Sequence, residues 1–247
     1  MASQPIYQFY AVLRDCKPKI WRRFQVLSNI TMSRLGYILM TMYEMEAQHL
    51  FRITVPVLKN AKLQYPDAKF DLTQLYPEEY WEFSVTDLDD FDLPDFPGVP
   101  KVRKHSASGC RLDHILNGQV GEKLVMEYDY GDGWEIDVAL EAVIIDKELS
   151  GRELPRVLEG KGFGIVENCG GPGGLEQLAE AFRRKRGPEY EEYREWLGCD
   201  DFDLTAFNAE DINFRLKKIP RIYRDIYEYD IPPTQRSIAL LERKYLK

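Results

Sequence analysis

Residues 122–145 read EKLVMEYDYGDGWEIDVALEAVII, and they carry the clearest structural signal in the chain. Two runs rich in apolar residues, 122–130 and 134–145, flank the turn Gly131-Asp132-Gly133. A tight connection between antiparallel strands needs backbone with positive φ, which glycine and aspartate adopt readily. The stretch therefore predicts a β-hairpin near the middle of the chain.

A second hairpin is predicted towards the N-terminus. It is formed by the runs YQFYAVLR (residues 7–14) and IWRRFQVLS (residues 20–28), which a turn-prone segment separates. Beyond it, apolar residues recur at helical spacing and predict an amphipathic helix over 32–45. The β-branched and aromatic residues of 49–55 then predict a strand that ends before Pro56.

Prolines and glycines divide the remaining sequence. Five prolines interrupt residues 58–108, so we expect a loop-rich insertion there with one strand at 81–85. Beyond Pro155 the pattern becomes helical. Together these elements predict an α+β fold, in which an antiparallel sheet built from hairpins packs against helices. We expect this domain to cover residues 1–218 and a helical C-terminal extension to cover 219–247.

Composition excludes several classes of protein. The 247 residues include 41 Asp and Glu against 33 Lys and Arg, for a formal charge of −8, and 44% of them are hydrophobic. Such values exclude wholesale disorder, and no run approaches the ~18 apolar residues of a membrane-spanning helix. The first residues also lack the pattern of a signal peptide, so we expect a cytoplasmic protein without membrane contact.

Four cysteines stand singly in the chain, without the C-x-x-C spacing of zinc or redox motifs. On this basis we assign no metal and no other cofactor. The net acidity argues against nucleic-acid binding over the whole surface, so any contact with phosphate would have to be local.

Five motifs follow one another in the order that is seen in the plasmid pRi Orf-three-like family, and the chain resembles that family over about residues 5–217. The resemblance implies an α+β domain of unsettled activity that occurs on plasmids and other mobile elements. Members are also described as the passenger TnpR-like protein of an insertion element. The motifs are KPKIWRR at 17–23, QHLF at 48–51, YDYGDGW at 128–134, the glycine run after Cys169, and YREWLG at 193–198.

The chain departs from the pattern of that family in three places, one of which is Glu44-Met45 where the family has Gly-Trp. Phe51 stands where the family has a second histidine, and Asn168 stands where an acidic residue precedes the glycine run. If the histidine pair of the family bound a metal, this chain would keep only His49 of that pair.

The motif Trp21-Arg22-Arg23 places two guanidinium groups beside an indole on a predicted strand, where neighbours point to opposite faces. One arginine could bind a phosphate or carboxylate through two hydrogen bonds while Trp21 stacks on a base. The alternative is structural: Trp21 packs in the core and both arginines pair with the excess of acidic side chains.

The segment 128–134 concentrates Tyr128, Asp129, Asp132 and Trp134 around its turn. Carboxylates at this spacing could hold a divalent cation, as in metal-assisted phosphodiester chemistry, and His49 could pair with one of them. However, aspartate and glycine are also favoured in hairpin turns for backbone reasons alone. The structural explanation is therefore favoured for this motif, and the cation site is the alternative.

Residues 183–186 form the one strong basic run of the chain, and Arg183, Arg184 and Arg186 could contact a phosphate backbone. Acidic residues follow in the next predicted helix, at Glu189 and Glu191 among others. The run could equally be a solvent-exposed face whose charge is neutralised locally.

The leading functional hypothesis from sequence is a non-enzymatic recognition protein of mobile-element origin that binds a macromolecular partner. A protein partner is favoured, and nucleic acid is an option through the local basic patches. The first alternative is a metal-assisted phosphodiesterase or nuclease that uses His49, Asp129 and Asp132. The second alternative is an acidic decoy that inhibits a host nucleic-acid-binding protein. The candidate binding residues are Trp21, Arg22, Arg23, His49, Tyr128, Asp129, Asp132, Trp134, Arg183, Arg184 and Arg186.

Overall fold

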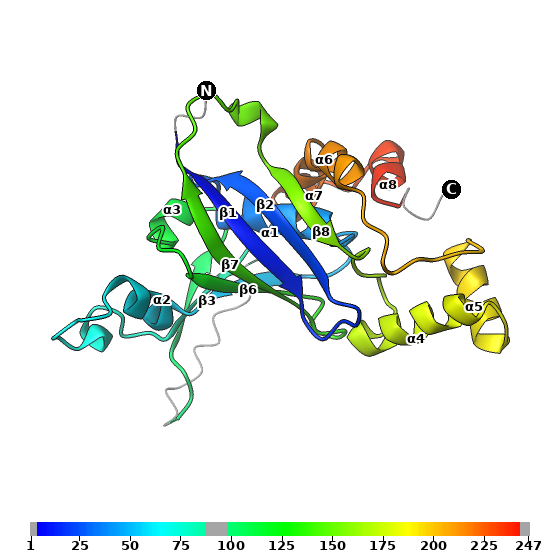
Figure 1. Ribbon diagram of the computed structural model, residues 1–247, viewed down its shortest axis with the longest axis horizontal. Helices are drawn as coiled ribbons and strands as arrows, with labels where there is room; N and C mark the ends of the chain where they lie inside the picture. The colour runs from blue at the N-terminus through cyan, green and yellow to red at the C-terminus, as the bar shows by residue number, and fades with distance from the viewer. Residues whose placement is uncertain (1–3, 87–97, 243–247) are drawn as a thin grey trace.

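The computed structural model of the chain describes residues 4–86 and 98–242. Eight strands form one sheet in the order β5-β4-β3-β6-β7-β1-β2-β8, and helices pack against it (Figure 1). Neighbouring strands are antiparallel except for β4 and β5, which are parallel. The α+β class and the antiparallel character predicted from sequence are confirmed.

Both predicted hairpins are present at the centre of this sheet. The first pairs β1 (Ile6–Leu13) with β2 (Ile20–Leu27), and the second pairs β6 (Lys123–Tyr128) with β7 (Trp134–Ile144). Strand β1 also pairs with β7, so the two hairpins join edge to edge. The alternating burial of these strands directs one face of the sheet towards the main hydrophobic core.

Helix α1 (Met32–Met42) supplies the other side of that core. It begins after Thr31, whose side chain accepts a hydrogen bond from the Arg34 backbone N–H. The helix ends three residues before the predicted limit at 45, because Glu44 adopts a left-handed backbone with φ 64°. The Met45 N–H then returns to the Met40 carbonyl, a contact that closes the helix and starts a loop towards the sheet.

The region expected to be a loop-rich insertion contributes to the sheet. After β3 (Phe51–Val55) it contains α2 (Val57–Gln64), the short helix η1 (Leu72–Gln74), β4 (Tyr80–Ser84) and β5 (Val102–Ser106). The expectation of one strand is wrong, since β5 is a second one. It lies at the sheet edge and is mostly exposed, so it lacks apolar alternation. Residues 87–97 of the expected insertion lie outside the described residues.

The expected change to helices beyond Pro155 comes later than predicted. Strand β8 (Arg156–Lys161) pairs with β2 at the opposite edge of the sheet and buries only Val157 deeply, so it has no clear strand pattern. Helices α4 (Gly171–Arg184) and α5 (Pro188–Leu197) follow. Short helices also occur as α3 (Leu112–Ile115) and η2 (Gly151–Glu153).

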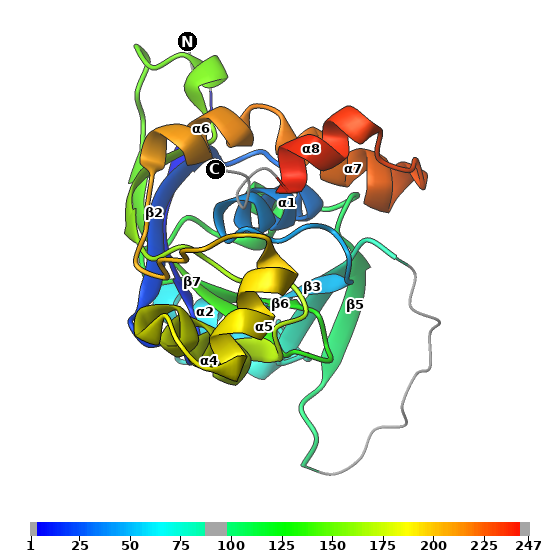
Figure 2. The same ribbon diagram turned by 90° about the vertical axis from the view of Figure 1, so that its right-hand side faces the viewer.

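The last three helices lie on the α1 side of the sheet, where α6 and α7 pack against α1 and α8 packs against α7 (Figure 2). They are α6 (Ala209–Leu216), α7 (Ile219–Tyr229) and α8 (Gln235–Glu242). Helix α7 packs against α1 through aromatic side chains. The rings of Tyr37 on α1 and Tyr227 on α7 are stacked, with 5.9 Å between their centroids. The described part of the chain contains no helix with the length and apolar content needed to span a membrane. The division at residue 218 stays a prediction.

Candidate functional site

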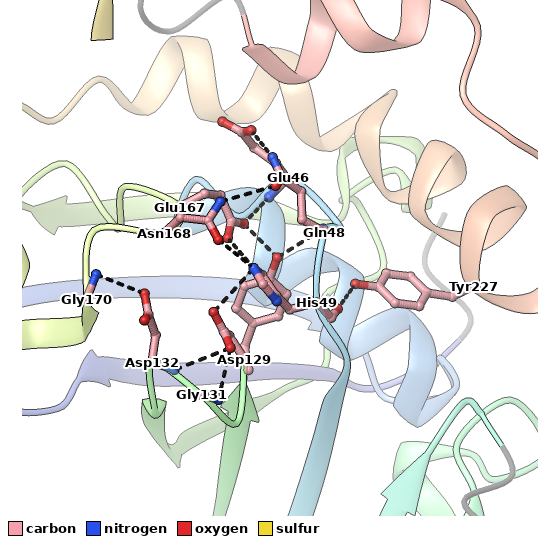
Figure 3. Close-up of polar contacts among 11 residues, drawn as sticks. Glu46, Gln48, His49, Asp129, Gly131, Asp132, Glu167, Asn168, Gly170 and Tyr227 are labelled. Carbon is pink, nitrogen blue, oxygen red and sulfur yellow. Dashed lines mark hydrogen bonds and ion pairs between the residues drawn. The ribbon is translucent and has the colours of Figure 1, made fainter. Parts of the chain in front are cut away.

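Three segments that are distant in sequence converge at one place (Figure 3). The loop between α1 and β3 supplies His49, the turn between β6 and β7 supplies Asp129, and the segment that precedes α4 supplies Glu167. One nitrogen or oxygen atom from each side chain lies within 4.8 Å of the others, which is a spacing that could hold a metal ion. We refer to these three residues as the His49 cluster.

Turn geometry fixes the carboxylate of Asp129. Its backbone is left-handed, with φ 53°, and its Oδ1 accepts hydrogen bonds from the N–H groups of Gly131 at 3.0 Å and Asp132 at 3.3 Å. Oδ2 is directed away from the turn and lies 3.3 Å from His49 Nε2. One oxygen therefore holds the turn and the other is presented to the cluster.

The two carboxylate oxygens of Glu167 also have different roles, although this side chain is more deeply buried than that of Asp129. Its Oε1 accepts hydrogen bonds from the Tyr128 hydroxyl at 2.6 Å and from the Glu46 N–H at 2.7 Å. Burial, together with the charge of Glu167, raises the pKa of Tyr128, so this hydroxyl stays protonated and donates. Oε2 faces His49 Nε2 at 3.7 Å.

His49 lies at the exposed edge of the cluster, with 29% of its side chain accessible against 5% for Glu167. In addition to the two carboxylates, its Nε2 has Asn168 Oδ1 at 3.2 Å. The backbone of His49 is held from the opposite side, because the Tyr227 hydroxyl of α7 donates to its carbonyl oxygen. Helix α7 therefore fixes the loop that carries the imidazole.

Close backbone contacts bring the Glu167 segment into place. A Cβ on Gly164 would lie 2.5 Å from the Tyr43 carbonyl oxygen, and one on Gly171 would lie 2.4 Å from that of Asp132. Both glycines have positive φ, at 140° and 70°. Any side chain at either position would therefore push the segment away from the other two loops.

More side-chain oxygens face His49 Nε2 than this nitrogen can donate to. Three side-chain oxygens face one ring nitrogen, which carries at most one proton and can donate to one of them at a time. Two of these oxygens belong to carboxylates that repel each other when both are ionised. A divalent cation would neutralise them, since imidazole nitrogen and carboxylate oxygen bind such ions at about 2.0–2.2 Å. The geometry therefore suits a cation with three protein ligands.

Two of the sequence candidates, His49 and Asp129, are brought together in the cluster, and two others border it. Tyr128 supports Glu167, while Asp132 accepts a hydrogen bond from the Gly170 N–H at 3.2 Å and so joins the hairpin turn to the start of α4. Trp134 is fully buried in the core, opposite Tyr128 in the hairpin.

The arginine motif lies away from the cluster, on β2. Arg22 is fully buried and donates to five backbone carbonyls, whereas Arg23 points to the other face of the sheet and pairs with Glu141 and Glu159. Trp21 packs beside Tyr10, with 5.2 Å between ring centroids.

The basic run lies on α4 and at its C-terminal end. Arg183 and Arg184 both pair with Glu180, at 2.6 Å and 2.8 Å, and Arg184 also approaches Glu189 at 3.9 Å. Arg186 follows the helix and is exposed. The structure does not bring this run into the His49 cluster.

Glu167 was missed by sequence reasoning. The glycine run after it predicts only a helix start, and nothing in the local pattern places this carboxylate beside a hairpin more than thirty residues away. A usable signal is the placement of Glu167 directly after Ile165 and Val166 and before Asn168, since a lone charge beside buried apolar residues needs polar partners.

Comparison with known proteins agrees with the fold and adds no activity. A family model described as plasmid pRiA4b ORF-3-like protein matches residues 5–211. The chain is 35% identical over 86 residues to the uncharacterized protein y4hQ of Sinorhizobium fredii, a match that spans 35% of this chain and 43% of y4hQ. The solved structure of MM3350, a protein of unknown function from Methanosarcina mazei Go1, is similar with a TM-score of 0.62 and 24% identity. That similarity covers 84% of this chain and 97% of MM3350 and concerns the fold alone.

Proposed function

The chain belongs to the plasmid pRiA4b ORF-3-like family, and we propose, from the geometry of the His49 cluster, that it is a metal-dependent hydrolase of phosphodiesters. The His49 cluster supports the proposal, because imidazole and carboxylate ligands lie within one coordination shell of each other. Three protein ligands leave coordination positions open for water and substrate. Catalytic metal sites keep such open positions, whereas structural sites fill them with a fourth protein ligand.

The chemistry follows from the charge of the cluster. Without a cation its carboxylates would repel an anionic phosphodiester, and a divalent ion reverses that interaction. Bound at His49, Asp129 and Glu167, the ion would lower the pKa of a water ligand and polarise a phosphoryl oxygen. The partial exposure of His49 leaves this edge of the cluster open to solvent.

Metal titration of the purified, chelator-treated protein tests the proposal. We expect one equivalent of Mn²⁺ or Zn²⁺ to bind in calorimetry and to support hydrolysis of bis(4-nitrophenyl) phosphate. Asp129→Asn should abolish both, while an asparagine oxygen still accepts the turn hydrogen bonds and asparagine tolerates left-handed backbone.

Asp137→Asn is the matched control for this experiment. It makes the same change of charge on β7, where Asp137 is half exposed and pairs with Arg14. It should bind metal as the unaltered protein does. The proposal is wrong if neither metal binds stoichiometrically, or if Asp129→Asn binds as tightly as Asp137→Asn.

Recognition of a protein partner is the second candidate, and one observation favours it. Trp196 on α5 is 47% exposed and lies 6.2 Å from the ring of Tyr193, so it offers the kind of aromatic anchor that interfaces use. Trp196→Ala should then release a partner that the unaltered protein retains, while metal binding is unchanged. The acidic decoy stays a prediction.

A further inference from the structure

A second candidate site lies between α7 and α8. An open surface groove with a volume of about 490 Å³ lies between α7 and α8, which pack side by side (Figure 2). Four basic residues line it: Lys217, Lys218, Arg221 and Arg236. No acidic side chain lines it among the described residues, although the chain as a whole carries a charge of −8. We refer to this feature as the α7–α8 groove.

The four cations are not equally free to bind a ligand. Lys217 Nζ donates to the carbonyls of Arg152 at 3.0 Å and Pro155 at 3.4 Å, and Lys218 Nζ lies 4.0 Å from the centre of the Phe214 ring. Arg221 and Arg236, by contrast, are exposed and form no ion pair with any residue that the structure describes. Their guanidinium groups come from two different helices and border the same space.

Guanidinium groups bind phosphate oxygens through paired hydrogen bonds, and two of them can share one phosphate chain. Ser237 adds a hydroxyl in the first turn of α8. Ile222, Ala239 and Leu240 supply an apolar surface to the same cavity, which suits a flat ring better than a bare anion. The volume is within the range of about 300–1,000 Å³ that is typical of small-molecule sites.

From this combination of charge, apolar surface and volume, we propose that the α7–α8 groove binds a nucleoside phosphate. The phosphates contact Arg221 and Arg236, and the base packs against Ile222 and Leu240. Either a free nucleotide or the phosphorylated end of a nucleic-acid strand supplies this chemistry. The site is separate from the His49 cluster and does not depend on a metal.

Calorimetric titration with adenosine diphosphate tests the inference directly. A chelator is kept in all solutions, so that a metal bound at the His49 cluster cannot contribute to phosphate binding. We expect saturable binding at one site, and an affinity that falls as salt rises from 50 to 200 mM because the contacts are charged. Arg221→Gln and Arg236→Gln should each weaken binding about tenfold, because each removes one charge-assisted contact with phosphate.

Arg103→Gln is the matched control, since it removes one exposed positive charge on β5, outside the groove. Thermal unfolding of all three variants reports whether they fold. Weakening by Arg103→Gln equal to that of the groove variants would overturn the proposal, because binding would then reflect overall charge. Absence of saturable binding at 1 mM nucleotide would overturn it as well, and would leave the metal titration unaffected.

Two further titrants distinguish the source of the ligand. A 5′-phosphorylated oligonucleotide that binds more tightly than adenosine diphosphate, with the same dependence on Arg221, assigns the groove to a strand end. Tighter binding of the free nucleotide assigns it to a small molecule. Inorganic pyrophosphate should bind more weakly than either, and equal affinity for pyrophosphate would contradict the role of Ile222 and Leu240 as the surface for a base.

Discussion

Arg22 and His49 each stand at the centre of a polar cluster, and the two clusters satisfy their charges in opposite ways. The Arg22 guanidinium donates to five backbone carbonyls at 2.8–3.1 Å. The ring nitrogen of His49 faces three side-chain oxygens at 3.2–3.7 Å. Each Arg22 donor has a carbonyl acceptor, whereas more side-chain oxygens face His49 Nε2 than it can donate to at one time. The first cluster completes the fold, and the second is where we propose that a cation binds.

Removal of Arg22 should give the largest loss of stability. Arg22→Met keeps a long apolar stem but leaves the carbonyls of Met42, Gly162 and Phe163, among others, without their donor. A buried network that loses one charged partner costs about 3–5 kcal/mol of the free energy of unfolding. Urea denaturation followed by circular dichroism measures the change.

Arg23→Gln is the comparison for that measurement. Arg23 lies next in sequence and pairs with Glu141 at 2.6 Å, but on a partly exposed face of the sheet. Such pairs contribute under about 1 kcal/mol. If Arg23→Gln destabilised the protein as much as Arg22→Met, the matching of donors and acceptors around Arg22 would not explain its role.

Glu167→Gln should separate stability from metal binding. The amide keeps an oxygen for the Tyr128 hydroxyl and the Glu46 N–H, and it removes a buried negative charge next to Asp129. We expect the metal-free variant to be as stable as the unaltered protein or up to about 1 kcal/mol more stable. Its affinity for Mn²⁺ or Zn²⁺ should fall by about 100-fold or more.

Thermal unfolding with and without metal measures both effects in one experiment. The unaltered protein should be stabilised by added metal, since an ion that binds only the folded state raises the unfolding temperature. Glu167→Gln should show no such rise. A clear loss of stability in the metal-free variant would contradict the comparison, because Glu167 would then hold the fold as Arg22 does.

Tyr227→Phe should have a smaller effect on stability and on metal affinity, because Tyr227 acts on the metal site only through His49. The hydroxyl donates to the His49 carbonyl, while the ring packs on Tyr37 and Phe51. Loss of the hydrogen bond should cost about 1 kcal/mol of stability and weaken metal binding several-fold, because the His49 loop becomes less fixed. Tyr229→Phe is the control, as this tyrosine is on the same helix and 57% exposed. Equal metal affinities of the two variants would show that Tyr227 only stabilises the fold.

The fold was predicted where its signals are local. The two hairpins and α1 follow from periodicity and turn residues within short windows. Strands β5 and β8 could not be found in this way, because each lies at an edge of the sheet and carries mainly polar residues. Only the pairing with β4 or β2 makes them strands.

The candidate site shows the same limit more strongly. His49 and Asp129 were both named from sequence, but they are 80 positions apart and their meeting depends on the pairing of β3 with β6. The segment that carries Glu167 can approach the other two loops only because Gly164 and Gly171 pack closely against Tyr43 and Asp132. A contact that tertiary packing creates leaves no periodic pattern in the chain, so its residues could be suspected singly but not assembled.

Cys169 gives the smallest expected effect, and it tests what kind of chemistry the His49 cluster uses. The thiol lies two residues after Glu167, and burial, with Asp132 nearby, raises its pKa to about 12. At pH 8 its thiolate fraction should be about a thousandfold below that of a thiol with the usual value near 9, so iodoacetamide should modify it slowly. Mass spectrometry of the alkylated peptide measures the rate, with the urea-unfolded protein as the reference.

Cys169→Ala should accordingly bind Mn²⁺ or Zn²⁺ as the unaltered protein does. The Cys169 thiol donates a long hydrogen bond, at 3.6 Å, to the Gly171 carbonyl, and its removal takes away a small side chain, so the loss in stability should also be small. Rapid alkylation of the folded protein would instead reveal an accessible thiolate beside the carboxylates. If Cys169→Ala bound the metal more weakly than the unaltered protein, the sulfur would be a metal ligand. The oxygen atoms around His49 would then not be sufficient to explain metal binding.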